Sequence, residues 1–198
     1  GPGAIFVDIG ANLGYWSAFA ASLVGPSGEI HAFEPVPAIF ASLERLAAAN
    51  PRHRFRLRNA ACGAERGVVP MAVVRPSPDN FDNFDINIGS NSVLPHFLDH
   101  GADLIETIDV DLIRFDDHVA EVGLDLDRVG LIKIDVEGYE SFCFDGMASV
   151  LARRGRRIPI LCEVLTDPER DPLLDGARIV ARLEAVGYTC LDATTLRP

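Results

Sequence analysis

The sequence of 198 residues has the length of one α/β domain of ordinary size. Apolar residues make up 48% of it, which is enough for a hydrophobic core and excludes a disordered chain. Acidic residues outnumber basic ones by 29 to 18, and the formal charge of −11 would repel a phosphate backbone, so we expect no nucleic acid as a partner.

The chain begins with a pattern of strand, tight turn and helix. Apolar, β-prone residues run from about Ala4, the turn holds Gly10 and Gly14, and an apolar helical pattern follows over residues 15–24. Glycines allow a ligand to approach the main chain, and the first N–H groups of the helix point toward the turn. The pattern therefore predicts a ligand cradle.

The charge beside this turn indicates which ligand it binds. A dinucleotide fingerprint needs three glycines, and counted from Gly10 the other two positions hold Asn12 and Tyr15. Asp8 at the mouth of the turn would repel a pyrophosphate, whereas it favours the ammonium and sulfonium groups of S-adenosylmethionine. This cofactor is our prediction. The alternatives are an NAD(P)-dependent oxidoreductase, or a turn that Asp8 merely caps.

A second acid follows the next predicted strand. Residues 29–33 are apolar, and Glu34 stands about 20 residues beyond the glycine turn, where an acid accepts hydrogen bonds from a ribose diol. Pro35 and Pro37 end the strand, and a helix is predicted over residues 38–49. The alternative for Glu34 is a solvated strand end.

The third predicted strand covers residues 55–62. Arginines alternate with apolar residues along its start, which is typical of an edge strand with one solvated face. The stretch Asn59-Ala60-Ala61 near its end is small and polar. We expect an adenine to lie against the backbone there.

Residues 63–115 interrupt the alternation of strands and helices. Two strands are predicted, over 68–74 and 105–113, and they indicate an antiparallel ribbon added to the main sheet. The loop over 79–92 is rich in Asn, Asp, Gly and Phe. It is either a lid or acceptor-binding element or a mobile surface loop.

Acids recur at the carboxyl ends of two later strands. Asp135 and Glu137 follow a strand predicted over 130–134, and Glu163 ends one predicted over 158–164. Because the carboxyl ends of adjacent parallel strands meet at one edge, we expect these three acids on the acceptor side, with at least one as general base. The other predicted elements are helices over 116–122, 141–151 and 173–186 and a final strand over 188–191.

Other roles for these acids remain open. We expect catalysis without a metal, and a divalent cation held by the same carboxylates is the alternative. Glu137 and Glu140 would otherwise cap the following helix, and Glu163 would pair with an arginine. In that case the next candidates for the base are His96, His100 and His118.

Neither the cysteines nor the arginine cluster indicates a further site. The four cysteines form no Cys-x-x-Cys pair, so we expect reduced thiols, no zinc site and a cytoplasmic protein. No apolar run is long enough to span a membrane, and the start lacks a signal peptide pattern. The arginine-rich stretch 153–157 is expected to complement a helix C-terminus rather than to bind an anion. The cysteines are Cys62, Cys143, Cys162 and Cys190.

The segments VDIGANLG, AFEPVP, NAACG, LIKIDVEGYE and ILCE, in this order, resemble the FkbM family of S-adenosylmethionine-dependent methyltransferases from Phe6 to about Leu191. The resemblance implies a class I methyltransferase (Rossmann-like) fold, α/β and doubly wound, with a mostly parallel sheet of strand order 3-2-1-4-5-7-6. It implies one domain over 1–198, with the antiparallel ribbon and loop inserted at about 63–115. Both ends are short for the family, as in a minimal or trimmed domain.

The resemblance also implies a reaction and a set of contacts. Family members transfer a methyl group to a hydroxyl on a sugar, a glycan or a polyketide-type metabolite, and a non-catalytic module that only binds a metabolite or a partner is the alternative. The pattern Asn87-x-Gly89-x-x-Ser92 resembles a family stretch in the inserted region. The expected cofactor-binding residues are Asp8, Gly10, Asn12, Gly14, Glu34, Asn59, Ala60, Ala61 and Asp135.

Overall fold

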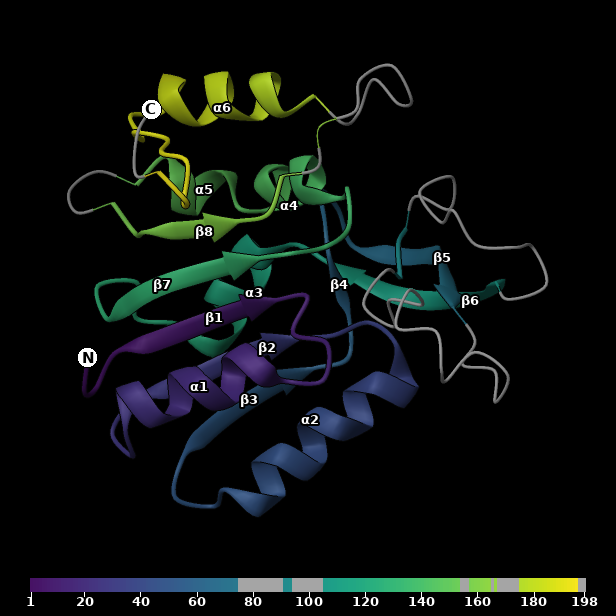
Figure 1. The fold of residues 1–198 in the computed structure, drawn as a ribbon, viewed down its shortest axis with the longest axis vertical. Helices are drawn as coiled ribbons and strands as arrows, with labels where there is room; N and C mark the ends of the chain where they lie inside the picture. Colours follow the sequence, from purple (N-terminus) through teal and green to yellow (C-terminus); the bar gives the residue numbers. More distant parts are fainter. Residues whose placement is uncertain (75–90, 94–104, 154–156, 165, 167–174, 196–198) are drawn as a thin grey trace.

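The computed structural model describes residues 1–74, 91–93, 105–153, 157–164, 166 and 175–195. Its centre is a five-stranded parallel sheet with the order β3-β2-β1-β7-β8 (Figure 1). These strands are β1 (Ile5–Ile9), β2 (Glu29–Phe33), β3 (Arg54–Arg58), β7 (Val129–Ile134) and β8 (Ile160–Cys162).

Helices cover both faces of this sheet, because its strands carry apolar side chains on both sides. Ile5, Val7 and Ile9 of β1 pack in one core, whereas Phe6 packs in another. The Phe6 face is covered by α1 (Tyr15–Val24) and α2 (Pro37–Ala49), as Figure 1 shows. Residues of the other helices enter the first core: α3 (Phe115–Val122), α4 (Glu140–Gly146), α5 (Ala148–Leu151) and α6 (Gly176–Ala185). The prediction of a doubly wound sheet is confirmed.

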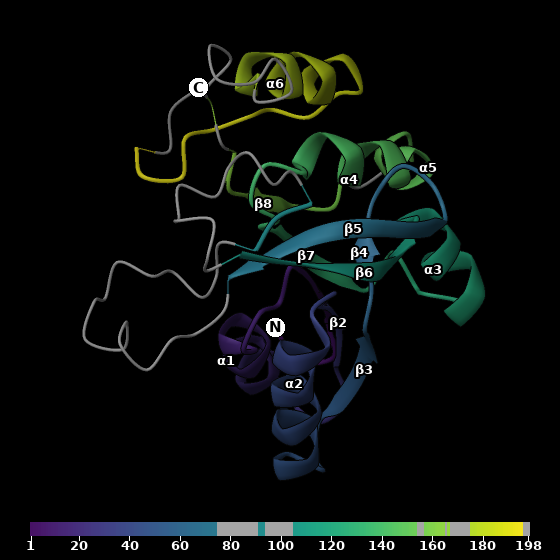
Figure 2. The same ribbon diagram turned by 90° about the vertical axis from the view of Figure 1, so that its right-hand side faces the viewer.

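A smaller sheet of order β4-β6-β5 lies beside the main one (Figure 2). β5 (Gly67–Val74) and β6 (Ile105–Ile113) pair antiparallel over their length, which confirms the predicted ribbon. Ser92 adds an antiparallel bridge to Ala72. The ribbon therefore brings residues of the inserted region next to the carboxyl edge of the main sheet.

The single strand predicted over 55–62 is wrong. β3 ends at Arg58, and the chain then crosses to β4 (Ala61–Cys62), which pairs with β6 in the small sheet. The side-chain amide of Asn59 donates to the carbonyl oxygens of Glu34 and Pro35, at 2.8 and 2.9 Å, and fixes the crossing. This crossing is determined by pairing with β6, which lies far away in the sequence.

The helix predicted over 141–151 is interrupted at Met147, which separates α4 from α5. The carboxylate of Asp116 accepts hydrogen bonds from the N–H groups of Ser149 and Val150, so α5 begins anew with a cap from α3. Capping from another element satisfies the first N–H groups of a helix as a local cap would.

The strand predicted over 188–191 is also wrong. Gly187 has a φ of 89° and turns the chain after α6, and the residues that follow pair with no strand of the described chain. Tyr188 instead packs against the core and lies under the guanidinium of Arg157, 5.5 Å from the ring centroid. The described sheet therefore matches only the first five positions of the expected order 3-2-1-4-5-7-6.

The arginine stretches behave as the sequence predicts where they are described. β3 is an edge strand, and the side chains of Arg54 and Arg56 are 61% and 64% exposed. Residues 154–156 lie outside the described residues, but Arg157 donates to the carbonyl oxygen of Leu151 at the end of α5. None of the described helices is long and apolar enough to cross a membrane.

Candidate active site

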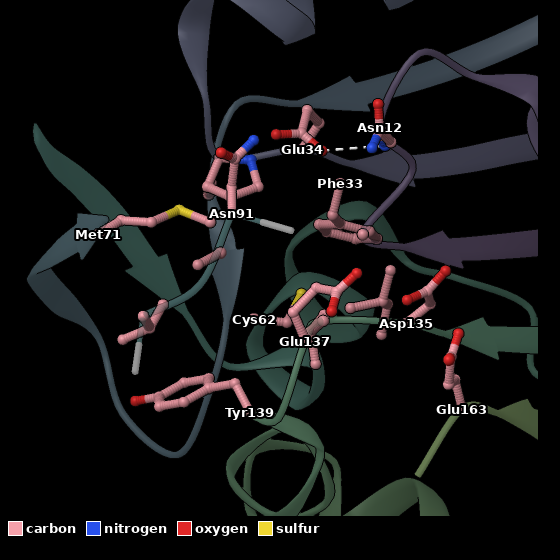
Figure 3. A pocket seen from close by; sticks show the side chains of 17 residues that line it. Asn12, Phe33, Glu34, Cys62, Met71, Asn91, Asp135, Glu137, Tyr139 and Glu163 are labelled. Carbon is pink, nitrogen blue, oxygen red and sulfur yellow. Dashed lines mark hydrogen bonds between the residues drawn. The ribbon is translucent and has the colours of Figure 1, made fainter. Parts of the chain in front are cut away.

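The carboxyl ends of the parallel strands meet at one edge, where a cavity of about 320 Å³ opens (Figure 3). Such an edge is the usual ligand site of a doubly wound sheet, and the volume is at the lower end of the range for small-molecule pockets. The cavity brings together eight of the predicted residues, which are Gly10, Asn12, Glu34, Ala60, Ala61, Asp135, Glu137 and Glu163.

Gly10 is required by the contact between two turns. Its φ is 76°, and a Cβ atom there would overlap the carbonyl oxygen of Asp135 in the turn after β7. Asn12 also has a positive φ, of 50°, and its side-chain oxygen accepts from the N–H of Leu13 at 2.7 Å. Asparagine tolerates this conformation better than most residues, so both positions follow from the shape of the turn.

Glu34 is a buried carboxylate at the cavity wall. It is 5% exposed, which contradicts the alternative of a solvated strand end. Its two oxygens accept from the N–H groups of Asn12 and Val36, each at 2.9 Å. Burial raises the pKa of Glu34 to about 7, although the two N–H donors favour the ionised form. Each oxygen retains a lone pair for a further donor.

The residues from Asn59 to Ala61 differ in their position relative to the cavity. Ala60 and Ala61 line the cavity beside Glu34. Asn59 does not line it, because its side-chain amide is bound to the carbonyl oxygens of Glu34 and Pro35. Asn59 therefore shapes the cavity wall from behind.

Asp8 and Gly14 do not line the cavity, in contrast to the prediction. Asp8 of β1 is fully buried beneath α1. Its Oδ2 accepts a hydrogen bond from the Ser17 hydroxyl at 2.6 Å, and its Oδ1 lies 3.4 Å from Nζ of Lys133. Burial raises its pKa, against the opposing effects of Lys133 and Ser17. Gly14 precedes α1 with a φ of 89° and packs against Leu43 of α2. Both residues support the turn from behind.

The three predicted acids lie together on the other side of the cavity (Figure 3). Glu137 has a φ of 52°, and its carbonyl oxygen accepts from the Ser92 hydroxyl at 2.7 Å. Backbone strain of this kind is common at functional sites. Burial and, to a smaller extent, the charges of Asp135 and Glu163 together raise the pKa of Glu137 to about 7. A carboxylate of this kind is suited to accept a proton near neutral pH.

None of the alternative roles is met in the described part of the chain, and Glu140 binds the turn before α4 rather than the first N–H groups of that helix. One oxygen of Glu140 accepts from the N–H groups of Val136 and Gly138, at 3.4 and 3.1 Å, so this acid shapes the turn. Glu137 lines the cavity, and Glu163 forms no salt bridge within the described part of the chain. Among residues 1–74, 91–93 and the later described ranges, no group of three or more His, Cys, Asp or Glu side chains has the geometry of a metal site.

Of the three histidines named as further candidates for the base, only His118 lies among the described residues. His118 is buried in the core, with its Nε2 2.9 Å from Nδ1 of His31, and does not line the cavity. His96 and His100 lie outside the described residues, as do Asn87 and Gly89.

Several wall residues were not predicted from the sequence. Met71 comes from β5 and Tyr139 from the turn before α4, so the small sheet and the β7 turn share one wall (Figure 3). Lys133 supports the turns after β1 and β7 from behind. In the sequence, a charged residue inside an otherwise apolar strand could have indicated this role. The other unpredicted wall residues are Ile9, Phe33, Pro35, Cys62, Asn91, Val93 and Val136.

All four cysteines are free thiols, as expected. Cys62 and Cys143 are buried, whereas Cys162 and Cys190 are partly exposed. Burial raises the pKa of each of these thiols, which keeps them protonated and unreactive.

Comparisons with known proteins agree with this geometry. The family model described as the Methyltransferase FkbM domain matches residues 8–190. The 31-O-demethyl-FK506 methyltransferase FkbM of Streptomyces tacrolimicus is 30% identical over 207 residues, which cover 95% of this chain and 74% of that protein.

A solved structure of a candidate rRNA-methylase from Clostridium thermocellum also aligns, at 30% identity, with 30% of this chain and 34% of that one. Its TM-score of 0.28 is too low to support an argument. The family match over residues 8–190 and the Streptomyces tacrolimicus relative are sufficient without it: this chain belongs to the FkbM methyltransferase family.

Proposed function

We propose that the protein transfers the methyl group of S-adenosylmethionine to a hydroxyl oxygen of a sugar, a glycan or a polyketide-type metabolite. Family membership supports methyl transfer, and the relative's name describes an enzyme for an O-demethyl form of FK506. The observation that carries the proposal is the cavity shared by Glu34 and by the acids after β7 and β8. It offers one wall to a nucleoside and another to an acceptor.

The residues present fit an adenosyl group. Glu34 has an unused lone pair on each oxygen for a ribose diol, and Ala60 and Ala61 leave the backbone open to an adenine. Gly10 allows close approach to the turn after β1. Asp135 lies where a carboxylate would favour a cationic ligand. When bound, S-adenosylmethionine supplies a methyl group activated by a sulfonium.

Glu137 is the proposed general base. It lines the cavity, and its pKa of about 7 allows it to take the hydroxyl proton as the new C–O bond forms. Asp135 and Glu163 can accept hydrogen bonds from the acceptor and so orient the attacking oxygen. Alignment for in-line displacement contributes most of the rate, and proton removal adds a factor of about 10²–10⁴.

The test is the mass gain of one methyl group when the protein is incubated with S-adenosylmethionine and a panel of sugars and polyketide alcohols. We expect Glu137→Gln to lose transfer and to keep cofactor affinity. Glu121→Gln, at an exposed position on α3, is the matched control. Unchanged transfer in Glu137→Gln would assign the base to another residue, and transfer to none of the panel would contradict this acceptor class.

Two further expectations belong to this proposal. The four free thiols support a reducing compartment, namely the cytoplasm. The formal charge of −11 supports a small-molecule or carbohydrate acceptor and disfavours nucleic acid.

A further inference from the structure

Lys133 is unusual in this chain both by its type and by its position. It is the only lysine in the sequence, and the other 17 of the 18 Lys and Arg residues are arginines. Its side chain is 7% exposed and comes from β7, which lies between β1 and β8 in the main sheet. A buried ammonium is costly unless it is paired, so its partners indicate its role.

Three oxygens surround the Lys133 ammonium. Nζ donates to the carbonyl oxygen of Gly10 at 2.8 Å, and it lies 3.2 Å from Oδ2 of Asp135 and 3.4 Å from Oδ1 of Asp8. Lys133 stands opposite Asp8 in the parallel register of β1 and β7, which explains why these two side chains meet. The ammonium thus joins the turn after β1 to the turn after β7.

Lysine suits this position better than arginine. An ammonium is compact and has three donors that can point in three directions, whereas a guanidinium is planar and larger. The other oxygen of Asp8 is already bound to the Ser17 hydroxyl, and Asp8 is fully buried, so there is little space for a larger group. A guanidinium would push the two turns apart.

Lys133 also determines the charge of the site. A second cavity, of about 220 Å³, adjoins the first through Asp135 and Glu163, and Lys133 lines it. Among the described residues that line the two cavities, Lys133 is the only lysine or arginine, against four acids. The ammonium lies between the carboxylates of Asp8 and Asp135, so it offsets part of the negative charge of the acids at the cavity wall. The acids of the two walls are Glu34, Asp135, Glu137 and Glu163.

We propose that Lys133 is a positioning residue that holds Gly10 and Asp135 in register and balances the carboxylates, and that it thereby limits the preference of the site for the cationic sulfonium over the neutral thioether product. The inference rests on the proposed function. S-Adenosylmethionine carries one net positive charge and S-adenosylhomocysteine none, so the loss of one cation from the site changes the two affinities unequally.

The single lysine allows a direct measurement in the unmodified protein. Protein labelled with ¹³C and ¹⁵N in lysine gives one side-chain signal in NMR spectra, which belongs to Lys133. We expect slow exchange of its NH₃⁺ protons with water and a larger shift of the signal with S-adenosylmethionine than with S-adenosylhomocysteine. Fast exchange, or equal shifts with both ligands, would overturn the inference.

Calorimetry of variants provides the second measurement. Lys133→Met should weaken the binding of S-adenosylhomocysteine by about tenfold or more, and it should shift the affinity ratio toward the sulfonium by about threefold or more. Lys133→Arg should not restore the wild-type affinities. Arg45→Met removes the same charge from an exposed position on α2 and is the control. Equal weakening of both ligands would show a merely structural role.

Two outcomes separate this inference from the proposed function. If the wild-type protein binds neither ligand, the proposed function fails, while the exchange rate of the Lys133 ammonium still tests the contacts. If Lys133→Met does not fold, the double variant Asp8→Asn/Lys133→Met removes both buried charges together and takes its place. Wild-type affinities in that double variant would overturn the role of Lys133.

Discussion

The contribution of Glu34 to the stability of the protein should fall with rising pH. Burial raises the pKa of this carboxyl from 4.5 to about 7. A carboxyl with a raised pKa holds its proton more tightly in the folded state. Its stabilising contribution is therefore complete below pH 4.5 and is lost as the pH rises through 7.

The size of the effect follows from the structure. The difference between 4.5 and about 7 corresponds to roughly 3 kcal/mol of unfolding free energy. In Glu34→Gln the amide oxygen can accept from only one of the two N–H groups of Asn12 and Val36, and its NH₂ group faces the other. That mismatch costs roughly 1–3 kcal/mol at every pH. The advantage of the wild type over the variant should thus shrink by roughly 3 kcal/mol from acid to alkaline pH.

Urea unfolding of both proteins between about pH 5 and about pH 8 measures this difference. The other titrating groups are shared and cancel in the comparison. Glu44→Gln, at an exposed position on α2, is the control and should show no such change. A difference between wild type and Glu34→Gln that stays constant over this range would refute a raised pKa for Glu34.

Three further predictions concern titration and partners. The rate of methyl transfer should rise as the pH increases through about 7, because Glu137 accepts the proton only when ionised; a rate that is flat there in initial-rate profiles would exclude Glu137 as the base. Burial lowers the pKa of His31 and His118 to about 4, so the contribution of this pair to the unfolding free energy should fall as the pH drops from 6.5 toward 4. Urea curves of His118→Gln, compared with wild type over that range, check this, and parallel curves would contradict it. Finally, the charge of −11 predicts no retardation of duplex DNA or RNA in a low-salt gel shift, and a tight, salt-sensitive complex would contradict that prediction.

Local patterns predicted the parts of the site that lie within one strand and one turn. The glycine turn at Gly10 and the acid at Glu34 each follow an apolar strand, and the parallel sheet brings both to the same edge. Asp135 and Glu137 follow from the same rule. These residues were predictable because the position of a strand end depends mainly on its own sequence.

The positions of other residues depend on contacts between segments that are distant in the sequence. Asp8 was expected to face a ligand, but the register of β1 with β7 places it beside Lys133, and α1 covers both. Asn59 was expected at a strand end, but it holds the crossing from β3 to β4, which depends on pairing with β6. Tyr188 lies in a stretch that was predicted to be a strand. It packs on the core after α6 instead, and no described strand pairs with it. None of these contacts can be inferred from periodicity.

A crystal structure of the protein with S-adenosylhomocysteine tests the central claim most directly. We expect the adenosyl group in the cavity at the carboxyl edge of the main sheet, with both ribose hydroxyls donating to Glu34 and the adenine against Ala60 and Ala61. The sulfur should lie on the side of Asp135 and Glu137. A nucleoside bound elsewhere, or a cavity left empty in crystals saturated with the ligand, would contradict the assignment of this edge as the cofactor site.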